Sequence, residues 1–248
     1  MSRLTWLGHS TVVVDLGGTR VVTDPVLRGR VWHLRRDADV TADSLGPLDA
    51  ILVSHVHFDH LDLRSLRRLD RKLPVVVPRG AGALVRRRGF GEVVELDVEE
   101  EVAIGAIRIR ATHAEHASGR GPFSATSPSL GYVLEASGSG SVYFAGDTDL
   151  FPAMSELAPL DVALLPVAGW GPRLGPGHLD PAGAAEALRL LRPKVAVPIH
   201  WGTFRTLFAE PAGDGPAREF ARLAGAVAPD VDVRVLAIGE TLALEADS

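Results

Sequence analysis

The chain has 248 residues, of which 46% are hydrophobic and 23% charged, and its formal net charge is −5. These values are typical of an ordinary globular protein and exclude a disordered or fibrous chain, while the acidic balance disfavours general nucleic-acid binding. Cysteine is absent, which excludes disulfides and thiolate metal sites, so any metal must be bound through His, Asp or Glu.

The length and the absence of a low-complexity linker predict one domain that spans residues 1–248. The opening segment, MSRLTWLGHSTVVVDLGG, lacks the apolar stretch and cleavage site of a secretory signal. No run of about 18 apolar residues occurs elsewhere in the chain. We therefore expect a cytoplasmic protein without a transmembrane segment, and the sequence leaves its oligomeric state unknown.

Short β-branched segments dominate the first half of the chain. Residues 11–16 and 19–23 flank Gly17-Gly18, which is a two-residue hairpin signal. Leucines then recur at helical spacing across residues 63–73, and Pro74 would end that helix. Further strands are predicted at residues 50–54, 75–77, 93–96, 102–104, 107–111, 131–136 and 142–145.

The second half alternates strands with helices. Asp180 followed by Pro181 is a good helix start, because an N-cap acceptor precedes proline at the first helical position. The pattern predicts strands at 162–167 and 195–199, helices at 181–191 and 217–226, and a hairpin over 233–244. Strands interleaved with helices in both halves indicate an α/β fold with two packed sheets and helices on the outer faces.

Four potential metal ligands follow the strand predicted at residues 50–54, namely His55, His57, Asp59 and His60. In an extended backbone residues 55, 57 and 59 point the same way, and a bend into the next segment would bring His60 beside Asp59. Imidazole and carboxylate suit zinc, but four such groups around one ion would leave no open position for catalysis. The motif therefore predicts two metal ions that share the cluster.

Three later segments complete the pattern: His116 in HASGR, Asp147 in FAGDTD and His200 in PIHWGTF. In this order the motifs resemble the metallo-β-lactamase superfamily, and the resemblance covers nearly the whole chain. The opening LGHST and TDP and the closing HLDP and PIHWGTF narrow it to the branch that includes N-acyl phosphatidylethanolamine phospholipase D and L-ascorbate-6-phosphate lactonase. The resemblance implies an αββα sandwich of four layers, in which two mixed sheets pack face to face with helices outside.

The resemblance also implies a reaction: hydrolysis of an ester, lactone or phosphodiester bond in a small molecule by hydroxide shared between two Zn²⁺ ions. Asp59 would orient this nucleophile and could carry its proton toward the leaving group. Mn²⁺ or Fe²⁺ are alternatives to zinc, depending on supply. The implied metal ligands are His55, His57 and His116 for one ion, Asp59, His60 and His200 for the other, and Asp147 as the bridge.

Other polar residues have roles that the sequence leaves open. The likeness of HASGR to the family's His-x-Ser-Gly-Arg favours His116 as the ligand, and leaves His113 to line the pocket, to contact substrate or to be a loop histidine. By the resemblance, His178 lies at the mouth of the site as a substrate contact or proton donor, with packing at a helix entry as the alternative. His9 is either a pocket or a core residue, and Asp24 is expected to accept a hydrogen bond from a metal-bound imidazole.

The predicted pocket walls are Phe58, the Trp32 loop, the loop from Arg120 to Phe123, Trp170 and Trp201. An arginine such as Arg120 there would favour an anionic substrate. One alternative is a nuclease of the same fold, whose arginine-rich segment 63–73 would bind RNA or DNA backbone. The other is an inactive metal-binding scaffold, against which the intact ligand set argues. A serine hydrolase is disfavoured because no serine lies in Gly-x-Ser-x-Gly.

Overall fold

The computed structural model describes residues 2–38, 40–120, 127–169, 174–206 and 213–244. Its first sheet, here the N-terminal sheet, has the strand order β17-β1-β2-β3-β6-β7-β8. The strands are β17 (Thr241–Ala243), β1 (Arg3–Trp6), β2 (Val12–Leu16), β3 (Thr19–Thr23), β6 (Ala50–Leu52), β7 (Val75–Pro78) and β8 (Val93–Leu96). β17 to β3 pair antiparallel and β3 to β8 parallel, so the sheet is mixed.

The second or C-terminal sheet is also mixed, with the order β16-β14-β13-β12-β11-β10-β9. Its strands are β16 (Asp232–Val233), β14 (Pro193–Ile199), β13 (Leu160–Pro166), β12 (Gly140–Phe144), β11 (Leu130–Ala136), β10 (Ile107–His113) and β9 (Glu101–Ile104). β16 to β12 pair parallel, and β12 to β9 antiparallel. The strands predicted in chain order are thereby confirmed to within a few residues at each end.

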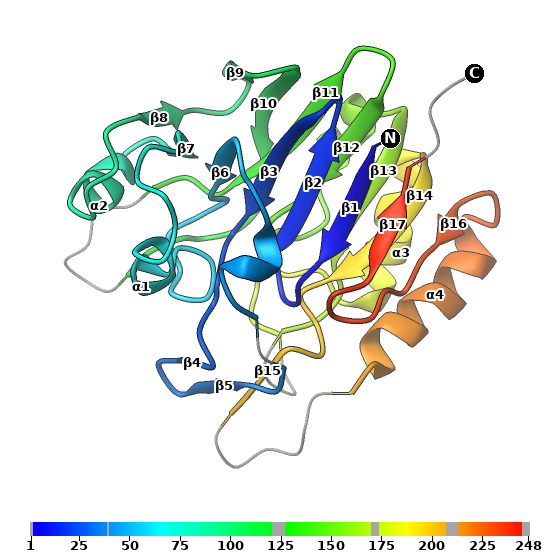
Figure 1. Cartoon of the computed structure of the whole chain (residues 1–248). Coiled ribbons are helices and arrows are strands. Elements are labelled where there is room, and N and C mark those ends of the chain that lie inside the picture. Colours follow the sequence, from blue (N-terminus) through cyan, green and yellow to red (C-terminus); the bar gives the residue numbers. More distant parts are fainter. Residues whose placement is uncertain (1, 39, 121–126, 170–173, 207–212, 245–248) are drawn as a thin grey trace.

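Helices cover the outer face of each sheet, which confirms the expected four-layer αββα arrangement. Figure 1 places the short helices α1 (Leu63–Leu66) and α2 (Gly82–Arg86) on one side and α3 (Pro181–Leu191) and α4 (Gly215–Val227) on the other. In the described ranges, the 3₁₀ turns η1 (Asp43–Leu45) and η2 (Pro152–Leu157) also lie outside the sheets. As predicted, Asp180 caps α3 by accepting a hydrogen bond of 2.7 Å from the amide of Gly183.

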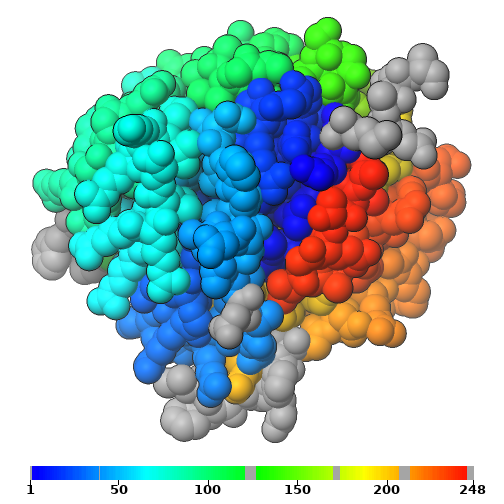
Figure 2. All heavy atoms as spheres, in the orientation of Figure 1, coloured from blue at the N-terminus to red at the C-terminus, as the bar shows by residue number. Residues whose placement is uncertain are grey.

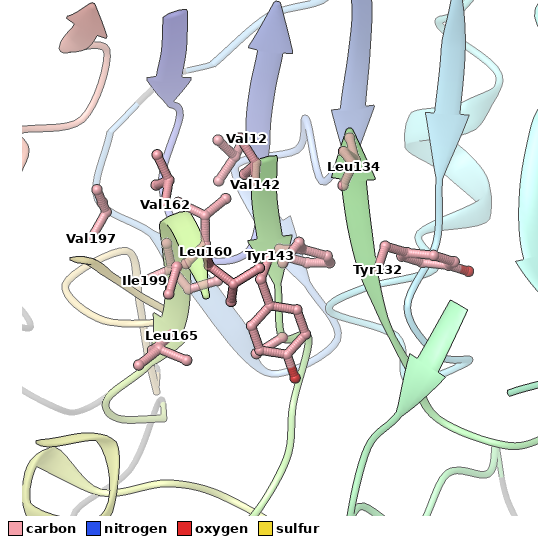
Figure 3. Packing of buried hydrophobic residues seen from close by; sticks show 14 of the residues in the cluster. Val12, Tyr132, Leu134, Val142, Tyr143, Leu160, Val162, Leu165, Val197 and Ile199 are labelled. Carbon is pink, nitrogen blue, oxygen red and sulfur yellow. The ribbon is translucent and has the colours of Figure 1, made fainter. Parts of the chain in front are cut away.

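The main core fills the space between the two sheets. Successive residues of a strand point to opposite faces, so Val12 and Val14 face the other sheet while Val13 packs under α1 and α2. Figure 3 shows Val12 beside Val142 of the opposite sheet, and Leu134 of that sheet belongs to the same core cluster. Each of these side chains is almost completely buried. The sheets are therefore held face to face by apolar side chains that the alternating pattern had already indicated.

Two sequence predictions are wrong. The helix expected over residues 63–73 ends at Leu66, and the chain continues in turns in which the amide of Leu69 donates to the carbonyl of Leu66 at 3.1 Å. The spacing of three between these leucines suits such turns as well as it suits a helix. The hairpin expected over 233–244 does not form, because β16 pairs with β14 and β17 with β1, each covering the edge of a different sheet. In Figure 2 the β17 segment (red) adjoins the first strands (blue) on the surface.

A small third sheet joins β4 (Arg30–Val31), β5 (Leu34–Arg36) and β15 (Phe204–Thr206), and the sequence did not indicate it. Its anchor is Arg36, whose guanidinium is buried and donates to the carbonyls of Val26, at 2.6 Å, and of Leu7. The same guanidinium lies over the ring of Phe204, 5.4 Å from its centroid. The Trp32 hairpin between β4 and β5 is thereby fixed to the segment that follows His200.

Within the described part of the chain, no helix combines the length and the apolar composition needed to cross a bilayer.

We expect Gly131→Ala to lower the free energy of unfolding by roughly 1–3 kcal/mol, the usual cost of overpacking a core. Gly131 lies in β11, and a Cβ there would come within 2.6 Å of the Thr112 hydroxyl and 3.0 Å of the Tyr143 ring. The control is Gly225→Ala on the exposed face of α4, where a Cβ meets nothing within 4 Å. There, alanine should stabilise the helix by about 0.5–1 kcal/mol. Thermal unfolding measures both changes, and midpoint temperatures that shift in the same direction for the two variants would contradict the prediction.

Candidate metal centre

The potential metal ligands lie in loops at the carboxyl ends of strands that all run in one direction within their sheet. Asp24 follows β3 and the segment His55 to His60 follows β6, which is parallel to β3. His116 follows β10, Asp147 follows β12 and His200 follows β14. Because parallel strands end at the same edge, side chains far apart in the sequence meet there. The structure thus brings together all seven residues that the sequence predicted as ligands.

Three imidazoles form the first group of candidate ligands. Nδ1 of His57 lies 3.0 Å from Nε2 of His55 and 3.1 Å from Nε2 of His116. His55 is fully buried, and the other two are partly buried. The three ring nitrogens lie within 4.8 Å of one another, a spacing that one metal ion can bridge.

The second group contains Asp59, His60, His200 and also His9. The Nε2 atoms of His60 and His200 are 3.3 Å apart, and Oδ2 of Asp59 lies 3.8 Å from Nε2 of His60. His60 and His200 are buried, and Asp59 is partly buried. This group matches the second set of ligands that the sequence suggested, with His9 as an added member.

Asp147 stands between the two groups. One carboxylate oxygen, Oδ2, lies 3.1 Å from Nε2 of His60 and 3.8 Å from Nε2 of His55, while Oδ1 lies 3.2 Å from Nε2 of His200. Gly146 makes this position possible, because it has φ +62° and a Cβ there would meet Cβ of Ser54 at 2.8 Å. The carboxylate therefore faces both groups at once.

The outer nitrogens of the buried rings fix which nitrogen faces the cluster. Nδ1 of His60 lies 2.7 Å from Oδ2 of Asp24, Nδ1 of His116 lies 2.8 Å from the Gly177 carbonyl, and Nδ1 of His200 lies 2.6 Å from the Ala168 carbonyl. These acceptors require an N–H on Nδ1, which leaves a lone pair on Nε2 of the neutral ring. The expected hydrogen bond from an imidazole to Asp24 is confirmed.

The cluster fits divalent metal on two further grounds. The Nε2 lone pairs of His60 and His200 face each other across 3.3 Å, and they cannot bond to one another without a proton or a cation between them. The buried Oδ1 of Asp147 also makes no hydrogen bond within the described part of the chain. A cation coordinated by nitrogen and carboxylate oxygen would satisfy both, and two such ions fit the two groups.

Burial favours the neutral form of His55 and His116, which metal coordination requires. At His60 burial is instead outweighed by the neighbouring carboxylates, Asp147 first, which raise its pKa well above the ordinary value. Burial, with a smaller contribution from His60, lowers the pKa of His55 well below its ordinary value. Burial also lowers the pKa of His116 to about 4, against the opposing effect of Asp147. For Asp147 itself burial opposes ionisation, but His200 and His60 hold the pKa of its carboxyl well below the usual range.

His9 is a buried partner of Asp59. Its Nε2 lies 3.1 Å from Oδ2 of Asp59, and burial followed by His200 lowers its pKa to about 3. The backbone holds this ring in place, since the His9 carbonyl accepts from the Trp6 indole at 2.9 Å and from the His200 amide at 3.0 Å. Of the two readings that the sequence left open, the structure thus favours a role beside the site.

The two remaining candidate histidines lie in different places. Nε2 of His178 is 3.5 Å from Oδ2 of Asp147, and its ring packs edge-on against that of His116 at 4.6 Å. His113 is half exposed, and it contacts Glu115 at 3.2 Å and the ring of Phe151. It lines a separate pocket of about 160 Å³, and none of the ligand groups within the described residues contains it.

The predicted pocket walls divide in the same way. Trp32, Phe58 and Arg120 line one pocket beside the ligand segment. Trp201 is instead buried and stacks on Trp6, with ring centroids 4.7 Å apart. Phe123 and Trp170 lie outside the described residues.

The sequence motifs did not predict the part played by Ser54, which directly precedes the ligand segment. The hydroxyl donates to Oδ2 of Asp24 at 2.6 Å and lies 3.0 Å from Nδ1 of His55, whose N–H it can accept. It thereby orients the first ligand and connects it to the carboxylate that orients His60. Its place directly before His55 was the available signal.

The comparisons with known proteins agree with this geometry. Residues 19–201 match the family described as Beta-lactamase superfamily domain. A UPF0173 metal-dependent hydrolase of Caldivirga maquilingensis is 32% identical over 98% of this chain and 99% of its own. N-acyl-phosphatidylethanolamine-hydrolyzing phospholipase D 1 of Caenorhabditis elegans is 32% identical over 81% of this chain and 64% of its own. The solved structure of Igni18, a metallo hydrolase from Ignicoccus hospitalis, superposes with a TM-score of 0.74 at 26% identity, covering 97% of each chain.

His116→Ala should lower metal occupancy, whereas His113→Ala should leave it nearly unchanged, because only the ring of His116 faces other ligands. Elemental analysis of the two purified variants, loaded with zinc under identical conditions, measures the difference. The reverse ranking would mean that the wrong histidine of the THAEH segment has been assigned to the metal.

Proposed function

Because the chain belongs to the Beta-lactamase superfamily domain family and is a metal-dependent hydrolase of the metallo-β-lactamase fold, we propose that it uses two zinc ions to cleave an ester, lactone or phosphodiester bond of a small molecule. The observation that carries this proposal is the position of Asp147, whose carboxylate faces two separate groups of imidazole nitrogens. One tetrahedral ion could not use all these ligands.

The proposed ligand sets follow the two groups. His55, His57 and His116 would hold one ion, Asp59, His60 and His200 the other, and Asp147 would bridge them. Asp24, Ser54 and the carbonyls behind His116 and His200 keep the rings turned toward the ions. Manganese or iron would fit the same nitrogen and oxygen donors if supplied in place of zinc.

Two ions bound here would supply a water of lowered pKa and polarise the oxygen of the bond that breaks. Asp59 would hold this water and accept its proton, while its Oδ2 stays fixed by His9. His178 is the proposed proton donor to the leaving group, since it is partly buried beside Asp147. Burial lowers the pKa of His178, but other effects, that of the Asp147 carboxylate first, outweigh burial and raise it. His113 has no proposed part in the reaction, because its contacts lie in another pocket.

A small-molecule substrate is favoured over a nucleic acid. The nuclease alternative depends on the arginines of residues 63–73 forming a strip along a helix, and α1 has only four residues. The net charge of −5 also opposes binding to long polyanions. A cytoplasmic location remains part of this proposal.

We expect about two divalent ions per chain in zinc-loaded protein, and hydrolysis of at least one class among phosphodiesters, phosphorylated lactones and acyl esters. Elemental analysis gives the first quantity, and a screen of the three classes with chelated protein as the control gives the second. Full activity at one ion per chain would contradict the dinuclear proposal. Two bound ions without hydrolysis of any class would favour the inactive scaffold.

Asp59→Asn should reduce kcat by at least ~10²-fold, the low end of what a positioned proton acceptor contributes. The amide keeps a carbonyl oxygen for the metal but cannot take up the proton, so the fold and the three-histidine group should be retained. KM should change less, because the pocket walls are untouched. Asp70→Asn, on the surface after α1, is the matched control for loss of one carboxylate. A variant with two bound ions and near-native kcat would exclude Asp59 from the chemical step.

A further inference from the structure

A second feature adjoins the segment that carries the ligands: a pocket of about 1000 Å³ rich in arginine. Phe58, which lies between the ligands His57 and Asp59 in the chain, is one of its lining residues. Arg120 ties the pocket to the same segment, because its guanidinium donates to the carbonyls of Val56, at 2.6 Å, and of Leu61. The arginines that line it are Arg28, Arg30, Arg64, Arg88 and Arg120.

Positive charge exceeds negative charge in this lining. Asp62 is its one acidic residue among those described, and Arg28 already engages both oxygens of that carboxylate at 2.7 and 2.8 Å. Arg88 and Arg120 line this pocket together, and burial with the charge of Arg88 lowers the pKa of Arg120 to about 10 against the effect of Asp62. Such a concentration of guanidinium groups is notable in a chain whose net charge is −5.

The arginines keep hydrogen-bonding capacity for a ligand. Nε of Arg88 is buried and has no hydrogen-bond partner in the described part of the chain. Arg64 is exposed, and no ion pair joins it to a carboxylate among the described residues. A guanidinium binds phosphate or carboxylate oxygens through two parallel N–H bonds, so these two residues suit an oxyanion.

Two aromatic rings form the apolar part of the pocket. Trp32 and Phe58 are 75% and 46% exposed, and their centroids lie 6.3 Å apart. The small sheet holds the hairpin that carries Trp32, while Arg120 lies over the ring of Phe58 at 4.6 Å. Exposed aromatic rings of this size usually mark a binding surface.

We propose that this pocket binds the non-reacting end of the substrate, an oxyanion (phosphate or carboxylate) joined to a flat apolar group. Arg64 and Arg88 contact the anion, and Trp32 and Phe58 contact the apolar group. The inference rests on the proposed function only in treating the bound molecule as the substrate of the neighbouring metal centre. The binding itself needs no turnover.

The test measures binding of phenylphosphonate, a non-hydrolysable probe, to the zinc-loaded protein by isothermal titration calorimetry. Arg64→Gln and Arg88→Gln should each weaken it about tenfold, the loss expected for one charge-assisted contact. The matched controls Arg67→Gln and Arg87→Gln remove exposed arginines that do not line the pocket and should change nothing. Trp32→Ala should weaken the binding of phenylphosphonate but leave the binding of inorganic phosphate unchanged.

Several outcomes would overturn the proposal. If the pocket variants bind phenylphosphonate as tightly as their controls do, the probe binds at the metal ions and not in the pocket. If uncharged benzamide binds as tightly as phenylphosphonate, the negative charge of the ligand has no role in binding. Oligonucleotide binding that depends on Arg64, without phenylphosphonate binding, would replace the small molecule by nucleic acid. Phenylacetate in a parallel titration decides between carboxylate and phosphate, and either result supports the site.

Three measurements, of thermal unfolding, metal content and hydrolysis, keep this test independent of folding and of catalysis. Thermal unfolding checks Arg88→Gln, whose side chain is partly buried, and the exposed Arg64 provides a second variant if Arg88→Gln does not fold. Metal content and hydrolysis are recorded for the same samples. If the probe binds as expected but no substrate is hydrolysed, the proposed reaction is contradicted and the binding pocket is not. If substrate is hydrolysed and neither pocket variant changes its KM, the role of the pocket in substrate binding is contradicted and the proposed reaction is not.

Discussion

Hydrogen bonds on the outer nitrogens of the buried imidazoles hold the candidate metal centre in its present form. Asp24 accepts from His60, and backbone carbonyls accept from His116 and His200, so each ring turns an unprotonated Nε2 inward. Nitrogen lone pairs brought within about 3 Å repel each other unless a cation lies between them. The protein therefore maintains an arrangement that is unfavourable by itself and becomes favourable when metal binds, which couples metal binding to stability.

The packing of the two sheets holds these side chains in place despite their unfavourable contacts. Parallel strands of both sheets end at one edge, and the apolar core between the sheets fixes the positions of those ends. Asp24 and Asp147 are both buried, and each lies in a loop that follows a strand of this frame, β3 and β12 respectively. A buried carboxylate without compensation would cost several kcal/mol, so the frame and the ligand set depend on each other.

The ligand segment that follows β6 serves both the metal centre and the arginine pocket. His57 and Asp59 belong to the candidate ligand groups, whereas Phe58 between them lines the pocket. Binding of a remote anionic group there would position the scissile bond without contacting the reacting atoms, and interactions of this kind contribute to orientation in enzymes. Substrate selection and the chemical step can then vary separately, because different side chains of one segment carry them.

The sequence alone determined the local features of this protein. Alternating β-branched residues predicted most strands, and the spacing of His55, His57, Asp59 and His60 predicted a metal cluster, because both depend on residues only two or three positions apart. Tertiary structure decided what lies far apart in the chain: the contact of His9 with Asp59, and the separate partners of β16 and β17. It also separated His113 from His116, since His113 is still part of β10 and faces outward while the chain turns before His116. Local patterns specify which side chains are available, but only packing of the two sheets specifies which of them meet.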